Sequence, residues 1–328
     1  MSTNQTIKTQ TVTFKVFRFN IETDFLPYYE TYELEVNHEE VVLDILNRIK
    51  WEKSGSLSYR RSCRHGICGA CAIKVNNKPV LACKENVFGL IKLFGNEMTL
   101  LPQSEKRSVK DFIIDKKDFW DKHEAVKPYL ISEIDENPTS EHLISPESVE
   151  RHAEADLCIQ CGACHYACPA IETNDEFFGP AAFVKAYRFA SDVRDDAHKE
   201  RLDVVNAPGQ GVWDCMKCFE CATSCPKDIN PIEKITKLHN RYFQDGVKPV
   251  SNVGTRHAEY LVHTIKKHGY LDEAGMVLYS ERASIVKHIP DALKMLKAGK
   301  LPMPWNMPKS KNLDEIKTLV EISHTSKL

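Results

Sequence analysis

Twelve cysteines in three tight groups of four constrain this chain of 328 residues more than any other feature. The groups are Cys63, Cys68, Cys71 and Cys83; Cys158, Cys161, Cys164 and Cys168; and Cys215, Cys218, Cys221 and Cys225. Two cysteines three residues apart are poorly placed to form a disulfide with each other, and scattered disulfides do not produce compact quartets. The pattern therefore predicts metal ligation.

The first quartet has the spacing C-x4-C-x2-C, followed by a more distant cysteine. In plant-type ferredoxins a compact loop with this spacing supplies three thiolates to a 2Fe-2S cluster, and a later residue supplies the fourth. Gly66 and Gly69 would let the backbone turn closely around the sulfurs and direct N–H groups at them. The alternative is a structural zinc site, but zinc sites usually show two paired C-x2-C knuckles.

The second and third quartets are two copies of one run, C-x2-C-x2-C-x3-C-P, ending at Pro169 and Pro226. In two-cluster ferredoxins three cysteines of each run hold one 4Fe-4S cluster, and the fourth crosses to the other cluster. The run therefore predicts two four-cysteine sets, and zinc remains the alternative. The sets are Cys158, Cys161, Cys164 and Cys225; and Cys168, Cys215, Cys218 and Cys221.

Hydrophobic patterns around the cysteines predict an α+β fold. Strands with alternating apolar residues are expected at residues 12–16 and 32–36, a helix at 42–49 and a hairpin around Asn76-Asn77. This order is that of a β-grasp domain. Later segments read as helices, including one that buries Phe183 and Tyr187, so a helical ferredoxin domain and a helical C-terminal extension are expected. The predicted parts are residues 1–115, a linker 116–150, the helical domain 151–245 and the extension 246–328.

Composition excludes several functions. Lys and Arg number 44 against 46 Asp and Glu, so no charge imbalance favours nucleic acid. No apolar run reaches the length of a membrane span, and the N-terminus lacks the features of a signal peptide. No Ser-His-Asp set, phosphate loop or dinucleotide fingerprint is present, so no catalytic residue is assigned. Membrane attachment is expected to come through a partner.

Several segments resemble the iron–sulfur subunits of succinate dehydrogenases and fumarate reductases. They are SCRHGICGACAIKVNNKPVLAC, VKDFIIDKKDFWDKHEAVKPYL, CIQCGACHYACP, GPAAFVKAYRFASDVRDD and CPKDINP, within about residues 12–245. The resemblance implies an electron-transfer subunit without a catalytic site of its own. Electrons would pass between a flavoprotein with covalent FAD, where fumarate and succinate interconvert, and a membrane anchor that exchanges electrons with quinone. It also implies the 2Fe-2S and first 4Fe-4S ligand sets given above.

The third centre departs from that family pattern. Typical members hold a 3Fe-4S cluster on cysteines that match Cys168, Cys215 and Cys221, and an apolar residue matches Cys218. The extra thiolate favours a second 4Fe-4S cluster, with 3Fe-4S as the alternative. The residues Ala170, Ile171, Glu172 and Met216 also stand where the family usually has its quinone-pocket residues.

The tail, including HTIKKHGYLDEAGM and IPDALKMLKAGKLPMPWNMP, is similar to segments of heterodisulfide-reductase-like subunits, whose anchors carry CCG cysteine motifs. Together the departures resemble the methylmenaquinol:fumarate reductases of anaerobic respiration. The resemblance favours a peripheral subunit on the periplasmic side, exported with the flavoprotein, and the cytoplasmic side is the alternative. Alternatives for function are a subunit of a thiol-driven fumarate reductase or another flavin dehydrogenase, and a zinc-stabilised scaffold. The extension is expected to cover the ferredoxin domain unless it binds a partner.

Overall fold

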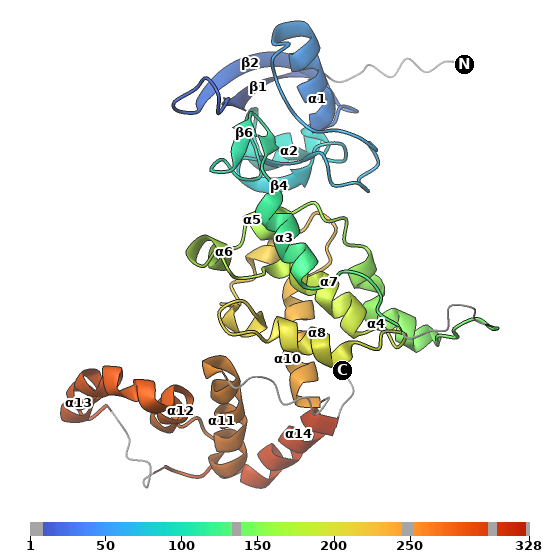
Figure 1. The fold of residues 1–328 in the computed structure, drawn as a ribbon. Coiled ribbons are helices and arrows are strands. Elements are labelled where there is room, and N and C mark those ends of the chain that lie inside the picture. Colours follow the sequence, from blue (N-terminus) through green and yellow to red (C-terminus); the bar gives the residue numbers. More distant parts are fainter. Residues whose placement is uncertain (1–8, 133–138, 245–251, 301–306, 326–328) are drawn as a thin grey trace. The chain divides into compact units, whose positions relative to one another are not determined.

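The computed structural model describes residues 9–132, 139–244, 252–300 and 307–325 (Figure 1). The chain divides into two compact units. Unit 1 comprises residues 1–201 and 216–235, and unit 2 comprises residues 202–215 and 236–328.

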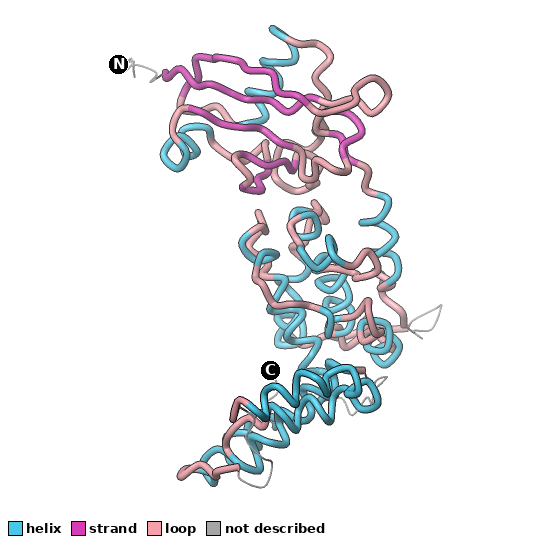
Figure 2. The backbone as a smooth tube through the Cα atoms, turned by 90° about the vertical axis from the view of Figure 1, so that its left-hand side faces the viewer, coloured by secondary structure: helices cyan, strands magenta, loops and turns pink. Residues whose placement is uncertain are grey.

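A five-stranded mixed sheet forms the N-terminal part of unit 1, where the described strands are gathered (Figure 2). The strand order is β2-β1-β5-β3-β4, in which β1 and β5 are parallel and the other pairs are antiparallel. The strands are β1 Thr9–Arg18, β2 Tyr28–Asn37, β3 Ala72–Val75, β4 Lys78–Leu81 and β5 Glu97–Leu101, with a separate pair β6 Ser108–Lys110 and β7 Ile113–Ile114. A parallel pair needs a crossover connection, which here contains the helices α1 Val42–Arg48 and α2 Val87–Phe94 and the π-helix η1 Ile49–Lys53.

The predicted patterns account for the core of this part. Val12, Phe14 and Val16 are fully buried on one face of β1, because successive side chains of a strand point to opposite faces. Asn76 and Asn77 both have positive φ, 46° and 66°, and join β3 to β4 in the tight turn expected of them. The β-grasp prediction is confirmed.

Helices make up the rest of unit 1. Phe183 and Tyr187 are buried on α7 as predicted, with Ala186 and Ala190 on the same face. The helices are α3 Lys117–Ala125, α4 Pro146–Asp156, α5 Ala163–Tyr166, α6 Pro169–Thr173, α7 Pro180–Ala190 and α9 Glu220–Thr223. Two further helices, α8 His198–Val205 and α10 Pro231–Gln244, carry residues of both units. The helical ferredoxin prediction is confirmed with the α+β class.

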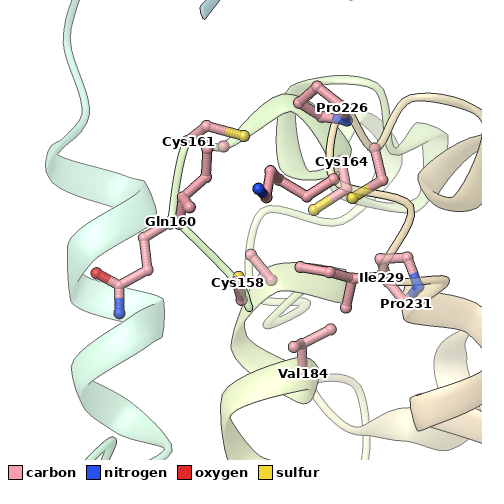
Figure 3. A pocket seen from close by; sticks show the side chains of 13 residues that line it. Cys158, Gln160, Cys161, Cys164, Val184, Pro226, Ile229 and Pro231 are labelled. Atoms are coloured by element: carbon pink, nitrogen blue, oxygen red, sulfur yellow. The ribbon is translucent and has the colours of Figure 1, made fainter. Parts of the chain in front are cut away.

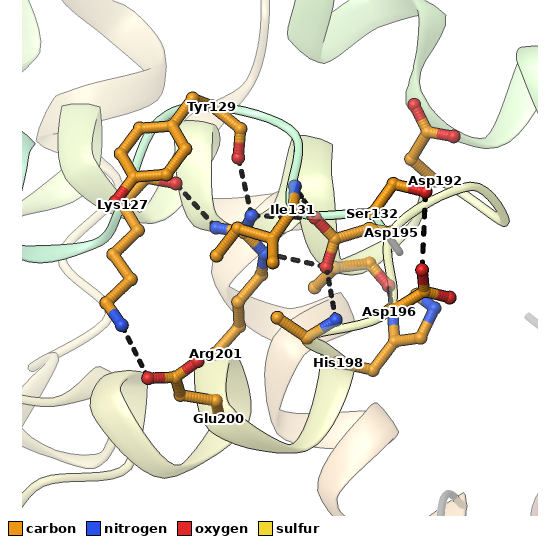
Figure 4. A network of polar contacts seen from close by, with 12 residues as sticks. Lys127, Tyr129, Ile131, Ser132, Asp192, Asp195, Asp196, His198, Glu200 and Arg201 are labelled. Carbon is orange, nitrogen blue, oxygen red and sulfur yellow. Dashed lines mark hydrogen bonds and ion pairs between the residues drawn. The ribbon is translucent and has the colours of Figure 1, made fainter. Parts of the chain in front are cut away.

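A buried ion pair fastens the segment after α3 to α8 within unit 1 (Figure 4). Arg201 donates to both carboxylate oxygens of Asp195, at 2.9 Å and 2.7 Å, and both side chains are buried. The same guanidinium donates to the carbonyl oxygens of Lys127 and Tyr129, at 2.5 Å and 2.6 Å. Asp195 in turn accepts from the N–H of Ile131 at 3.1 Å. The segment 127–131 is therefore held by its backbone.

Unit 2 is built from helices. They are η2 Val212–Asp214, α11 Val253–His268, α12 Glu273–Glu281, η3 Arg282–His288, α13 Ile289–Lys297 and α14 Leu313–Thr325. The first long helix, α11, starts at Asn252, whose side chain accepts from the N–H of Thr255 at 2.8 Å, and ends at Gly269. The helices expected around Leu293 and around Leu313 to Val320 are present as α13 and α14.

Candidate iron–sulfur cluster sites

The loop that carries the first cysteines directs backbone N–H groups at sulfur. Sγ of Cys63 accepts from the N–H of His65 at 3.3 Å and of Cys68 at 3.4 Å. Together with the N–H of Ile67 they lower the pKa of the Cys63 thiol to about 6. Gly66 and Gly69 both have φ of +68°, which only glycine adopts easily. This loop therefore favours a thiolate at Cys63, as a metal ligand requires.

The β3–β4 hairpin brings the other two cysteines of this quartet to the loop. Ala72 pairs with Leu81 at the open end of the hairpin, and the N–H of Ala82 donates to the carbonyl of Cys71 at 3.1 Å. Cys71 and Cys83 lie just beyond those ends and are both buried. Burial, and the nearby thiols of Cys83 and Cys68, raise the pKa of Cys71 to about 12. The structure thus brings together all four predicted 2Fe-2S ligands.

A pocket in the helical part of unit 1 is lined by all four cysteines predicted for the first 4Fe-4S cluster. Figure 3 shows Cys158, Cys161 and Cys164 around it, and Cys225 also lines it. The other lining residues are mostly apolar or small: Ile159, Gly162, Ala181, Val184, Pro226, Ile229 and Pro231, with Gln160 and Lys227. Cys225 therefore lies with the three cysteines of the other run, as the crossing pattern predicts.

The apolar lining of this pocket affects the pKa values of the cysteine thiols in it. Burial raises the pKa of Cys158, raises that of Cys161 to about 11 and raises that of Cys164 well above its ordinary value. Such thiols bind metal by releasing their protons to solvent, and the positive charge of the metal then compensates the buried thiolates. An apolar pocket lined by four cysteines fits an iron–sulfur cluster.

The second cysteine run repeats the backbone of the first. Gln160 and Gly162 have positive φ, 54° and 90°, and so do their counterparts Lys217 and Phe219, at 53° and 66°. In each run the residue after the second cysteine precedes a four-residue helix, α5 or α9. Hydrogen bonds also correspond: the N–H of His165 donates to Gly162 O, and the N–H of Ala222 donates to Phe219 O. The backbone at Cys218 therefore matches the backbone at Cys161.

Three of the four cysteines predicted for the third centre lie in unit 1. Cys168 and Cys221 are buried and Cys218 is exposed. Burial raises the pKa of Cys168, and the neighbouring thiol of Cys218 raises it further, so these two residues lie close enough to interact. Cys215 belongs to unit 2, and its assignment to this set rests on the spacing of the run.

The two cysteine-bearing parts of unit 1 touch at Gly69. A Cβ at this position would lie 2.8 Å from Cα of Cys161 and 3.0 Å from the carbonyl oxygen of Ile159. Beside this contact Lys116 donates from Nζ to the carbonyl oxygen of Cys161 at 3.0 Å. Neither the contact at Gly69 nor the hydrogen bond from Lys116 could be predicted from the sequence. The turn of the cysteine loop is sufficient reason for a glycine at position 69, and Lys116 is far from any cysteine along the chain.

Two family models match the chain at these sites. Residues 13–121 match a 2Fe-2S iron-sulfur cluster binding domain, and residues 154–229 match a 4Fe-4S dicluster domain. The fold and the cysteines thus define an iron–sulfur protein with two kinds of cluster-binding domain. Within that class, the chain belongs to the iron–sulfur subunits of fumarate reductase and succinate dehydrogenase, oxidoreductase subunits that transfer electrons.

Its relatives include the fumarate reductase iron-sulfur subunit of Haemophilus influenzae, 36% identical over 234 residues, which cover 68% of this chain and 90% of that protein. The succinate dehydrogenase iron-sulfur subunit of Coxiella burnetii is 35% identical over 71% of this chain and 98% of that protein. Among solved structures, a chain of the Mycobacterium smegmatis Sdh1 complex in the apo form has a similar fold. Its TM-score is 0.63 at 24% identity, with 74% of this chain and all of that chain covered.

Proposed function

We propose that this chain relays electrons between an FAD-containing fumarate reductase/succinate dehydrogenase subunit and a membrane-anchor subunit linked to the quinone pool. The names of its relatives support this role, since they are iron–sulfur subunits of both kinds of complex. Three clusters bound by the cysteines would supply one-electron steps. The chain's own part is to hold the ligands, limit the access of water by burying five of the twelve cysteines and partly burying five more, and keep the two cluster-binding parts in contact at Gly69.

We propose a 2Fe-2S cluster on Cys63, Cys68, Cys71 and Cys83, and 4Fe-4S clusters on the two crossed sets. The repeated backbone carries the proposal for the third centre. Because Cys218 has the local conformation of Cys161, it is the natural fourth ligand to the set of Cys168, Cys215 and Cys221. The 3Fe-4S alternative would leave this thiol without iron.

Electron paramagnetic resonance tests the third centre. In the anaerobically purified complex, no strong 3Fe-4S signal is expected in the oxidised state. The variant Cys218→Ala removes the fourth thiolate, so it should show that signal at up to one spin per protein. Met216→Ala is the matched control, because Met216 is an exposed neighbour without a ligand role. A 3Fe-4S signal in the native complex, or none in the variant with the cluster retained, contradicts the assignment.

The anchor is proposed to be of the non-classical kind, with CCG cysteine motifs and methylmenaquinol as electron donor. The observation in favour is the replacement of the usual quinone-pocket residues by Ala170, Ile171, Glu172 and Met216. A thiol-driven fumarate reductase is the second candidate, favoured by the similarity of the tail to heterodisulfide-reductase-like subunits. Steady-state assays of the complex with a menaquinol analogue and with a dithiol donor separate the two.

Location follows from this assembly. We propose a peripheral subunit on the cell membrane, exported with its flavoprotein to the periplasmic side; the cytoplasmic side is the alternative. In the described residues, no helix is long and apolar enough to cross a bilayer. Protease accessibility of the subunit in intact spheroplasts distinguishes the two sides.

We also propose domain boundaries near residues 115, 150 and 245.

A further inference from the structure

The segment Arg282–Lys297 of unit 2 forms one helical run, in which the 3-10 helix η3 continues into α13. Pro290 lies in the first turn of α13, where proline is common because its fixed φ suits the helix. The run stops at Gly299, whose φ is +66°, and the N–H of Lys300 donates to Met295 O at 3.0 Å. Both ends of α13 therefore have local signals that do not depend on packing.

The apolar face of this run is open to solvent. Ile289, Leu293 and Leu296 are spaced i, i+4, i+7, so they lie on one side of α13. They are 47%, 55% and 47% exposed, and Val286, one turn earlier, is 66% exposed. Large apolar side chains gathered on one exposed face mark an interaction surface.

The charged residues around this apolar face indicate which kind of partner it binds. From Arg282 to Lys300 the chain has five basic residues and one acidic residue, Asp291. Lys294 and Lys297 each directly follow one of the leucines, which places an ammonium group at the border of the apolar face. An exposed apolar stripe bordered by cations is the pattern of helices that lie in the interface of an anionic bilayer.

Helix α14 offers a contrast within the same unit. It also exposes a large apolar side chain, Leu319, at 65%. However, its charged residues are mainly acidic, Asp314, Glu315 and Glu321 against Lys317, so an anionic surface would repel it. Of these two helices, α13 is the one that combines an exposed apolar face with basic residues at its borders.

We propose that η3 and α13 bind directly to the surface of a bilayer that contains anionic lipids. The apolar face enters the acyl boundary and the lysines contact headgroup phosphates. This contact goes beyond the proposed anchor subunit, because the chain itself would hold the membrane. It also orients unit 2 with the long axis of α13 parallel to the bilayer plane.

Sedimentation with lipid vesicles tests this inference on the full chain with its clusters loaded anaerobically. Vesicles of phosphatidylcholine and phosphatidylglycerol in equal parts should bind the protein, and vesicles of phosphatidylcholine alone should bind it much more weakly. Leu293→Glu should weaken binding about tenfold or more, because it replaces buried apolar surface by charge. Changing both Lys294 and Lys297 to Gln should weaken binding about fivefold for each lysine and reduce its salt dependence.

Leu319→Glu is the matched control, since it makes the same change on the exposed face of α14 and should leave binding as it is. Circular dichroism of each variant checks that its helices are retained. Absence of binding to anionic vesicles, or equal binding by the native chain and Leu293→Glu, overturns the inference. Binding that requires the anchor subunit in the vesicle overturns it too, in favour of a protein partner for α13. These results do not depend on electron transfer, so they can fail while the proposed function stands.

Discussion

Lys116 places a cation beside a proposed cluster ligand. Its Nζ donates to the carbonyl oxygen of Cys161, and burial lowers its pKa, partly offset by the thiol of Cys161. A positive charge near an iron–sulfur cluster stabilises the reduced form, whose negative charge is greater. Lys116 is thus a positioning residue that would also raise the reduction potential of the first 4Fe-4S cluster.

Replacing Lys116 by Met is expected to lower that potential by on the order of 40 mV, which corresponds to a charge effect of about 1 kcal/mol for one electron. Redox titration followed by electron paramagnetic resonance measures it. Lys117→Met is the control, because Lys117 is exposed and paired with Asp121 at 2.5 Å. An equal shift in both variants would rule out a specific role for Lys116.

At the scale of single residues, the cysteine spacing predicts which thiols lie near one another better than it predicts what surrounds them. Cysteine spacing led to sets that the structure brings together for the 2Fe-2S loop and for the pocket around Cys164. The hydrogen bond from Lys116 could not be predicted, because lysine is common and its partner is a backbone carbonyl remote in sequence. The positive φ of Phe219 could not be predicted from the sequence either, because a bulky residue rarely adopts it.

Among the elements, the clamp of Arg201 on Asp195 has the clearest energetic role. Removing one member of a buried ion pair leaves the other charge uncompensated, and here it also releases the carbonyls of Lys127 and Tyr129. Arg201→Ala is therefore expected to lower the free energy of unfolding by about 3–5 kcal/mol. Denaturation in urea under anaerobic conditions, followed by circular dichroism, measures this loss.

Lys127→Gln provides the comparison for that measurement. Lys127 pairs at 2.5 Å with Glu200, and both side chains are at least one-third exposed. A surface pair of this kind contributes at most about 1 kcal/mol. If both variants lost the same small amount, the segment 127–131 would not depend on the buried pair.

The sequence patterns of the β3–β4 hairpin and of α13 differ in how much of the local structure they predict. The β3–β4 hairpin follows from Asn76-Asn77 alone, because asparagine tolerates the positive φ that the turn requires. For α13 the periodic pattern predicts the helix but not its surroundings. Leu293 and Leu296 are 55% and 47% exposed, because periodicity defines an apolar face but does not identify the surface that this face contacts.

At the scale of the whole molecule, the contact at Gly69 links the two cluster-binding parts of unit 1. It therefore affects both stability and electron transfer between the clusters. Gly69→Val would force its side chain against Cys161, because even a Cβ lies 2.8 Å from Cα of Cys161. We expect a loss of about 1–3 kcal/mol in stability and slower electron transfer between the 2Fe-2S and 4Fe-4S clusters. Thermal unfolding and stopped-flow absorbance measure the two effects.

Gly55→Val serves as the control for that experiment, since a Cβ at Gly55 meets nothing within 4 Å. Unchanged electron transfer in a folded Gly69→Val protein would show that electrons do not pass through this contact. The parts that meet here were predicted as separate domains from composition and motifs. Their contact was not predictable, because a glycine leaves no side chain from which to infer a neighbour.

The position of Cys225 in the pocket of Cys158, Cys161 and Cys164 also affects how the protein is made. A ribosome releases Cys164 long before Cys225, and the helix α7 is complete in between. The nascent chain therefore passes through a stage in which this site has three thiols and one side open. Iron loaded then would be incompletely ligated, so maturation factors that deliver intact clusters should act after translation has passed residue 225.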